Sequence, residues 1–445
     1  MKNAAEELLA LWRTGRIDEF LARSDELDPA DLADVLAAAA DDERIAIVKR
    51  LPASLSGSAL WEMPAEEHAG ETLAALEPAQ AAGIVEELPD DDAADLLADL
   101  EPEDRARILA HVGDPEQRDE VVELLQYDSE SAGGLMTTRV VTVLDSATVG
   151  QALDEIRQQA EEVEEFSEAY VVTPLGRLVG VMTFKRLVLS SPGRPVREAM
   201  EEHEVTVRPE TDQEEVARLM ARYNVSSIPV VSADDRLLGR ITFDDVLDVG
   251  EAEATEDMLR FGGVSADEDL RAGWTEAVRS RLPWLLVNMV TAYVAAMVPL
   301  YFDTTIERIS FVAAYMGMVA GMGGNTGTQA LAVNVRRLAL GLIDFNQFGS
   351  VIRKELAVGA ANGFVVGILA GAGAGLIQRN ALFGVAVFIT MNANLVVAGF
   401  AGAFIPLLLK RVGVDPALAS SVFVTTLTDI CGFFLLLGLS TALLL

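Results

Sequence analysis

Five long stretches with almost no charge follow Pro283, and they constrain the fold more than any other feature of the 445-residue chain. Four of them contain no Asp, Glu, Lys or Arg, and the last contains one ionisable group, Asp429. A helix needs about 20 apolar residues to cross the hydrocarbon core of a bilayer, and soluble domains need a charged surface. We therefore expect five transmembrane helices, within residues 284–302, 309–335, 356–378, 380–409 and 416–445.

Basic residues near these stretches indicate how the chain is oriented. Only Arg308 and Arg379 lie on one side of the expected spans, whereas nine basic residues lie on the other. Lys and Arg are enriched in cytoplasmic loops, so we expect a multi-pass protein of the plasma (inner) membrane with a cytoplasmic N-terminus and an external C-terminus. The first 20 residues lack the apolar core of a secretory signal. The nine residues are Arg271, Arg279, Arg281, Arg336, Arg337, Arg353, Lys354, Lys410 and Arg411.

Charge divides the chain into two unlike parts. Residues 1–260 hold 59 acids and 23 bases, whereas residues 261–445 hold 10 acids and 11 bases. An acidic surface of this size repels phosphate backbones, which excludes a nucleic-acid partner. One cysteine, Cys431, excludes a disulfide framework and a cysteine-based zinc site. No nucleophile–base pair or phosphate-cradling loop stands out, so we do not expect an enzyme.

A short repeat organises residues 1–130. Leu76-Glu77-Pro78, Leu88-Pro89-Asp90 and Leu100-Glu101-Pro102 recur at intervals of 12 residues. Proline fits the first turn of a helix, where its missing N–H is not needed. Each unit is therefore expected to be one short helix, and the units together a small solenoid whose hand the pattern does not reveal.

The surface of this solenoid is very acidic. Carboxylates on it either keep the domain soluble or supply hard oxygen ligands for Mg²⁺ or Ca²⁺. The residues concerned are Asp90, Asp91, Asp92, Asp95, Asp99, Glu101, Glu103 and Asp104.

Residues 137–249 contain a β-α-β-β-α pattern twice, with one short strand expected at Val205–Val207. The segment Gly180–Arg186 matches Gly239–Asp245, and Ser227-Ile-Pro-Val-Val231 precedes the second copy. This pattern resembles a tandem pair of cystathionine-β-synthase-type (CBS) domains, which usually sense adenosine nucleotides.

The resemblance implies that Thr242 and Asp245 could hold the ribose of ATP or another adenosine nucleotide. The first copy has Arg186 where the second has Asp245, so at most one full site is expected. A pair of CBS domains that binds no nucleotide and only dimerises remains open.

The expected architecture is therefore multidomain. It comprises an all-α acidic N-domain at 1–130, an α/β CBS pair at 137–195 and 196–249, a connecting helix at 250–282, and an all-α transmembrane domain of five helices at 283–445.

Asp429 is the strongest candidate for a functional residue in the membrane half. A carboxylate at mid-membrane is costly, by about 2.5–3.5 kcal/mol on insertion scales. No Lys or Arg lies in any other span to pair with it, so we expect Asp429 to face water or a cation. Thr425 and Thr428 lie on its helical face and add oxygens there.

A second polar cluster lies within the second span, at Gly323–Gln329. Its glycines allow close helix packing, and they weaken the helix, so backbone carbonyls and the Asn325 amide could line a cavity. Close packing alone would explain the glycines, but it does not explain Asn325, Thr326, Thr328 and Gln329 at membrane depth.

These features together resemble the MgtE family of magnesium channels and transporters, over essentially the whole chain. The matching membrane motifs are Gly323–Gly327, Gly413–Leu418 and Thr425–Asp429. The resemblance implies a homodimer in which Asp429 forms the ion-selecting ring at the dimer axis, and we expect Asn325, Thr425 and Thr428 beside it. It also implies regulatory Mg²⁺ ligands among Asp91, Asp95, Glu214, Asp245, Asp248, Glu253, Glu256, Asp257 and Asp415.

The expected function is Mg²⁺ movement into the cytoplasm, with closure by cytosolic Mg²⁺ bound to the acidic domains. Mg²⁺ dehydrates reluctantly, so a few carboxylates reaching it through retained water suit it. The alternatives are a membrane-anchored CBS nucleotide sensor, a carrier of another divalent cation such as Mn²⁺ or Co²⁺, and a chloride channel. The anion channel is disfavoured because the core offers an acid. Channel and carrier are not distinguished.

Overall fold

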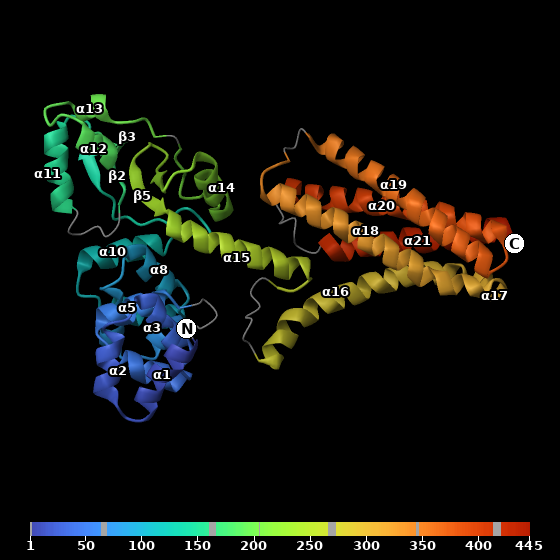
Figure 1. Cartoon of the computed structure of the whole chain (residues 1–445), viewed down its shortest axis with the longest axis horizontal. Helices are drawn as coiled ribbons and strands as arrows, with labels where there is room; N and C mark the ends of the chain where they lie inside the picture. Colours follow the sequence, from blue (N-terminus) through green and yellow to red (C-terminus); the bar gives the residue numbers. More distant parts are fainter. Residues whose placement is uncertain are drawn as a thin grey trace. The chain divides into compact units, whose positions relative to one another are not determined.

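The computed structural model describes residues 2–445 apart from 64–68, 160–165, 204, 266–272, 344–346 and 413–419. The chain forms two compact units, Met1–Glu251 and Ala252–Leu445 (Figure 1). The first unit contains the acidic helices and the CBS pair, and the second contains the long apolar helices.

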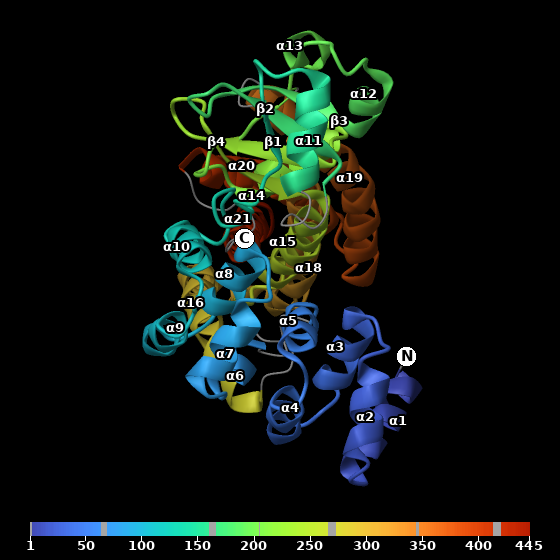
Figure 2. The same cartoon turned by 90° about the vertical axis from the view of Figure 1, so that its left-hand side faces the viewer.

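Among the described residues, ten short helices make up the N-domain (Figure 2). Helices α1, α3, α5, α7 and α9 contact one another in sequence as one row, and α4, α6, α8 and α10 form a second row; α1 with α2, α3 with α4 and α6 with α7 also make contact. This two-row stack is the predicted solenoid. Proline lies in the first turn of α7 and α9, as the repeat predicts, and also in the first turn of α3 and α10, whereas Pro89 is the N-cap residue of α8. The helices are α1 (Lys2–Arg13), α2 (Ile17–Ser24), α3 (Pro29–Ala37), α4 (Asp41–Val48), α5 (Ala53–Trp61), α6 (Ala69–Ala74), α7 (Pro78–Val85), α8 (Asp90–Ala98), α9 (Pro102–Leu109) and α10 (Pro115–Leu124).

The CBS pair forms two small sheets. In the first, β1 pairs in parallel with β2, which pairs antiparallel with β3; in the second, β4 pairs antiparallel with β5. The hydroxyls of Tyr170 and Ser227 lie 2.7 Å apart and join the two copies. The elements are β1 (Thr142–Leu144), α11 (Val149–Gln159), β2 (Glu168–Val172), β3 (Leu178–Thr183), α12 (Phe184–Leu189), α13 (Val196–Ala199), α14 (Gln213–Tyr223), β4 (Ser227–Val231) and β5 (Leu237–Thr242).

The strand expected at Val205–Val207 is reduced to one bridge, so that prediction is wrong. Val207 makes a single parallel bridge to Val230, with one hydrogen bond at each end of the contact. Pro209 follows two residues later and has no N–H to continue the pairing. The second sheet therefore has two strands where the first has three.

The connecting segment is not one helix over 250–282, as the sequence predicts. Helix α15 (Phe243–Phe261) begins inside the second CBS domain, and α16 (Trp274–Tyr301) begins ten residues before the expected first span at 284. Gly263 ends α15 with a φ of 75°, and Val264 N donates to Leu259 O at 3.0 Å. Glycine adopts this left-handed conformation without the steric cost that other residues meet.

In the part of the chain that the structure describes, the second unit contains five long helices and no strand, which confirms the predicted all-α membrane domain. Among the described residues, α16, α19, α20 and α21 are long and apolar enough to cross a bilayer. Helix α18 has 27 residues, which is sufficient length, but Gly323–Gln329 makes it less apolar. The elements are α16, α17 (Asp303–Arg308), a 3₁₀ turn (Ser310–Val312), α18 (Ala313–Ala339), α19 (Phe348–Ile377), α20 (Ala381–Val412) and α21 (Ser420–Leu444).

Glycines bring α19 and α20 into backbone contact. A Cβ at Gly359 would lie 2.6 Å from Leu395 O, and one at Gly371 would lie 2.6 Å from Gly384 O. Helices in a bilayer associate through such close packing because lipid tails offer no hydrophobic gradient between them. Helix α20 also contacts α18 and α21, so it is the centre against which the candidate ion-pathway helices are placed.

Candidate ion pathway and regulatory acids

Asp429 lies on α21 and is half-buried in the protomer. The two threonines expected beside it donate to carbonyls of their own helix: Thr425 Oγ1 donates to Ser421 O at 3.0 Å, and Thr428 Oγ1 donates to Thr425 O at 2.9 Å. Thr428 is completely buried, whereas Thr425 is partly accessible. In the protomer Thr428 therefore packs inside the helix cluster, and only Asp429 and Thr425 reach an accessible surface.

Helix α18 is continuous through the glycine-rich segment, so the expected loosening of its backbone is wrong. Each glycine disfavours a helix by about 1 kcal/mol, but Gly323 and Gly327 are buried against neighbouring helices and that packing offsets the cost. The carbonyls thus stay within the helical ladder. The polar side chains Asn325 and Gln329, one turn apart, are exposed on the protomer.

A seam between α18 and α21 brings the two polar motifs together. A Cβ at Gly324 would lie 3.6 Å from Thr425 Cγ2, and one at Gly327 would overlap Val424. Asn325 follows Gly324 directly, and Asp429 lies one turn after Thr425. Asn325 and Asp429 are therefore each within a turn of the same contact, a proximity that sequence spacing does not reveal.

A cluster of acids lies where α8 meets the start of α15, within the first unit. Burial, together with the neighbouring Asp90 and Asp245, raises the pKa of Asp91 to about 8. Burial likewise raises the pKa of Asp92 to about 9 and of Asp95 to about 7, with Asp245 contributing to both. Like charges in a poorly solvated place repel one another. We call Asp91, Asp92, Asp95 and Asp245 the acid cluster.

The donor chemistry of the acid cluster fits a hard divalent cation. Asp91 is 9% exposed, and its Oδ1 is buried without a hydrogen-bond partner in the part of the chain that the structure describes. Among those residues, no three acidic, histidine or cysteine side chains lie close enough to hold a metal ion as they stand. A cation here would therefore require the carboxylates to rotate towards one another.

Asp90, the neighbour of this cluster, is not on the acidic surface where the sequence places it. Asp90 is completely buried. It accepts hydrogen bonds from Thr137 Oγ1 at 2.8 Å, from Thr138 N at 2.9 Å and from the Thr138 hydroxyl. These donors belong to the segment that leads into the first CBS domain. Asp90 thus ties the N-domain to the CBS pair, a role that a run of three aspartates does not indicate.

The other expected regulatory acids are dispersed. Asp248 is exposed, and burial together with Asp244 and Glu251 raises its pKa. Glu214 lies in the first turn of α14. Glu256 forms an i,i+4 ion pair with Arg260 on α15, between Glu253 and Asp257 on the same helix. Asp415 lies outside the described residues.

The expected nucleotide pair forms a closed local arrangement. Thr242 N and Oγ1 donate to Asp245 Oδ2 at 3.0 and 2.6 Å, which caps the start of α15. In the first copy, Arg186 forms an ion pair with Glu201 instead. The second copy alone retains a carboxylate at this position, as the sequence predicts.

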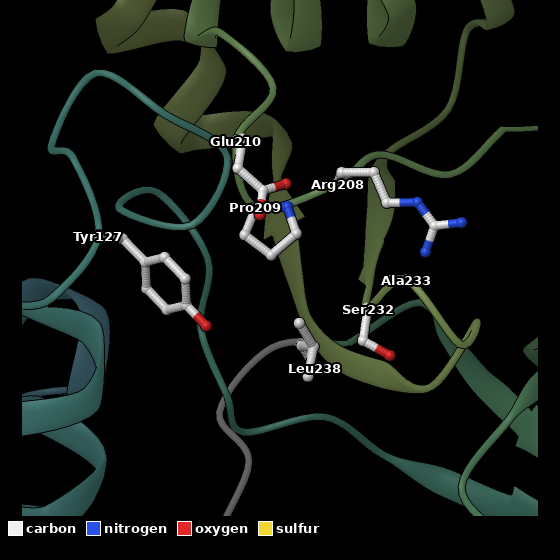
Figure 3. A pocket seen from close by; sticks show the side chains of 7 residues that line it. All are labelled: Tyr127, Arg208, Pro209, Glu210, Ser232, Ala233 and Leu238. Carbon is white, nitrogen blue, oxygen red and sulfur yellow. The ribbon is translucent and has the colours of Figure 1, made fainter.

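Two cavities in the CBS pair contain neither Thr242 nor Asp245. One of about 580 Å³ has Tyr127 and Arg208 on opposite sides in Figure 3, and one of about 440 Å³ includes Arg177 and Asp235. Sequence analysis missed these residues because they come from separate strands and turns that only folding brings together. The linings are Tyr127, Arg208, Pro209, Glu210, Ser232, Ala233 and Leu238, and Thr173, Arg177, Leu178, Val179, His203, Thr206, Val231 and Asp235.

Comparison with known proteins agrees with this organisation. The MgtE family model, described as a divalent cation transporter, matches residues 316–439, the MgtE intracellular N domain matches 27–130, and the CBS domain matches 132–192 and 196–251. The magnesium transporter MgtE of Bacillus subtilis is 32% identical over 441 residues, 98% of this chain and 96% of the relative. The chain belongs to the MgtE family of magnesium transporters.

Other MgtE proteins support the same assignment. The magnesium transporter MgtE of Thermus thermophilus is 37% identical over 329 residues, 74% of this chain and 73% of the relative. A crystal structure of the cytosolic domain of the Mg²⁺ channel MgtE in complex with ATP is 36% identical, with a TM-score of 0.52, and covers 55% of this chain and 99% of that one. This member of the MgtE family is thus a multi-pass membrane protein with cytosolic N-terminal domains, and not an enzyme.

We predict that Asp90→Ala loosens the link between the N-domain and the CBS pair. The substitution leaves the buried donors of Thr137 and Thr138 unsatisfied, so the free energy of local opening at Thr138 should fall by about 2 kcal/mol. Hydrogen exchange at the Thr138 amide measures it. Glu103→Ala, an exposed first-turn acid of α9, is the control. Unchanged exchange in Asp90→Ala would contradict the assigned role.

We also predict that, without divalent cations, the packing of α8 against the start of α15 weakens as pH rises. We call the packed arrangement the docked state and the separated one the open state. The pKa values of Asp91, Asp92 and Asp95 lie well above the ordinary value of about 4, so the docked state holds more protons than the open state. Its stability is therefore full below about pH 4 and declines up to about pH 9. For each proton released, hydrogen-exchange protection should change by about tenfold per pH unit.

Hydrogen exchange of α8 at pH 5.5 and 8.5, corrected for intrinsic rates, tests this. Millimolar Mg²⁺ should restore protection at the higher pH. Asp91→Asn/Asp95→Asn should remove most of the pH dependence. Protection that is independent of pH in the absence of Mg²⁺ would show that the acid cluster does not oppose docking.

Proposed function

We propose that the chain forms a homodimeric pathway that selects Mg²⁺ through Asp429 and carries it into the cytoplasm. One observation carries the proposal. A half-buried carboxylate on an otherwise uncharged helix lies within a turn of the seam that also carries Asn325. Exposed amides and acids do not suit lipid, so this polar surface is expected to face a partner copy and an aqueous path.

A two-fold axis would double the single carboxylate. Two Asp429 side chains facing one ion supply the few hard oxygens that suit Mg²⁺, which keeps much of its water shell. Asn325 and Thr425 would hydrogen-bond to that water. Thr428, which is buried, would act through packing and not by contact with the ion.

We further propose that cytosolic Mg²⁺ closes the pathway through the acid cluster. Divalent cations would cancel the repulsion among Asp91, Asp92, Asp95 and Asp245 and favour docking of α8. Asp245 lies in the first turn of α15, a continuous 19-residue helix of about 28 Å. At its other end, Phe261 packs against the apolar cluster that α18, α20 and α21 form with Leu331, Val335, Ala401 and Val424. The ion would thus bias a two-state element, as linkage requires.

The remaining acids and the nucleotide pair have proposed roles in the same regulation. We assign further Mg²⁺ contacts to Asp248, Glu253, Asp257 and Asp415, whereas the ion pair of Glu256 with Arg260 competes with such a role. Because the related cytosolic domain was crystallised with ATP, we propose an adenosine nucleotide at the second CBS copy. The external C-terminus follows from the distribution of Lys and Arg.

The prediction that tests the proposal is loss of Mg²⁺ uptake in Asp429→Ala. Without the carboxylate, uptake into proteoliposomes should fall by about tenfold or more, equivalent to about 1.4 kcal/mol of lost ion stabilisation. The variant should still insert, because a costly buried acid has been removed. Asp303→Ala, an exposed acid of the same unit, is the control. Wild-type Mg²⁺ uptake and ion discrimination in Asp429→Ala would overturn the assignment.

A further inference from the structure

A buried amide occupies the centre of the membrane unit. Asn394 of α20 is completely buried. Its Nδ2 donates to Val319 O of α18 at 3.1 Å, and its Oδ1 is buried without a hydrogen-bond partner among the described residues. An apolar residue of similar volume would pack here without the cost of a half-satisfied amide, so packing alone does not account for Asn394.

Glycines on two other helices make room for this side chain. A Cβ at Gly323 of α18 would overlap Asn394 Nδ2 and lie 3.1 Å from Thr428 Cβ. A Cβ at Gly432 of α21 would lie 2.8 Å from the same Nδ2. The carboxamide thus fills the point where α18, α20 and α21 meet.

The contacts of Asn394 bracket the two polar motifs. On α18 it contacts Val319 and Gly323, and Asn325 follows two residues later. On α21 it lies beside Gly432, three residues after Asp429, and Gly323 lies next to both Asn394 and Thr428, the residue before Asp429. A shift of either helix relative to Asn394 would therefore move Asn325 relative to Asp429.

We propose that Asn394 is a positioning residue that sets the spacing between α18 and α21, and thereby the geometry of the ion-selecting side chains. Asn394 does not contact the ion, because it is completely buried. The inference rests on the proposed function, since it assumes that Asp429 and Asn325 line the pathway. Asn394 would affect ion selectivity, because it fixes the positions of the side chains that must match the water shell of a strongly hydrated ion.

Asn392 supplies a matched control on the same helix. Its Nδ2 donates to Ala360 O of α19 at 3.3 Å, so it makes the same kind of bond to a helix that carries neither Asn325 nor Asp429. Loss of this bond should affect assembly of α19 and α20 without moving α18 against α21.

The experiment compares Mg²⁺ and Ca²⁺ uptake by full-length variants in proteoliposomes. Asn394→Ala and Asn394→Leu should lower the ratio of Mg²⁺ to Ca²⁺ uptake by about fivefold, the value of one hydrogen bond. Asn392→Ala should stay within about twofold of the wild-type ratio, as expected for an independent site. Asn394→Leu keeps the branched shape of the side chain and lacks the donor, so it stands in if Asn394→Ala does not insert.

A double variant separates positioning from packing. Gly323→Ala/Asn394→Ala refills the space of the carboxamide without restoring its bond. Its thermal stability should exceed that of Gly323→Ala alone, whereas its Mg²⁺ to Ca²⁺ ratio should remain low. A wild-type ratio in this double variant, or an equal loss in Asn392→Ala, would overturn the positioning role.

Asp429→Ala in the same assay distinguishes the two proposals. If Asp429→Ala loses Mg²⁺ uptake while Asn394→Leu keeps the wild-type ratio, the positioning role fails and the proposed function stands. If both variants transport Mg²⁺ with wild-type selectivity, both proposals fail.

Discussion

The absence of water in the bilayer core is the constraint on which the rest of the molecule depends. A polar group placed there is costly unless the protein satisfies it or it faces an aqueous path. Glycines let α18, α19, α20 and α21 approach at backbone distance, so that they pack closely without a hydrophobic gradient. The polar groups that remain are then sorted: Thr428 and Asn394 are buried at helix contacts, whereas Asn325 and Asp429 reach the protomer surface. The proposed function rests on this difference in exposure, because it leaves an amide and a carboxylate on the surface near the α18–α21 seam.

In the first unit, the main physical constraint is repulsion between buried carboxylates. Asp90 shows that a buried carboxylate is stable where three donors meet it, and the next residue, Asp91, shows the reverse with one oxygen unpartnered. The link between the N-domain and the CBS pair therefore combines a satisfied contact with a repulsive one. In the proposed regulation, a cation changes the balance between them, and α15 carries the consequence to Phe261.

Much of this organisation could be predicted from the sequence, because hydropathy, charge and short repeats are local signals. The uncharged stretches predict the membrane helices, and the proline spacing predicts the solenoid. Features that depend on long-range contacts could not be predicted. Asp90 and Asp91 are identical in type and adjacent, yet only the fold distinguishes their partners. The glycines of α18 favour a broken helix locally, but packing against α20 and α21 keeps it intact. Gly263, similarly, ends α15, whereas the predicted connecting helix extended to residue 282.

The reversal potential of the reconstituted wild-type protein is the measurement that tests the central claim most directly. Currents would be recorded across a planar bilayer with separate gradients of Mg²⁺, Ca²⁺ and Cl⁻. The proposed function predicts a reversal potential that follows the Mg²⁺ gradient alone, with current that falls as Mg²⁺ rises on the cytosolic side. A reversal potential that follows Ca²⁺ or Cl⁻, or a Mg²⁺ current insensitive to cytosolic Mg²⁺, would contradict it.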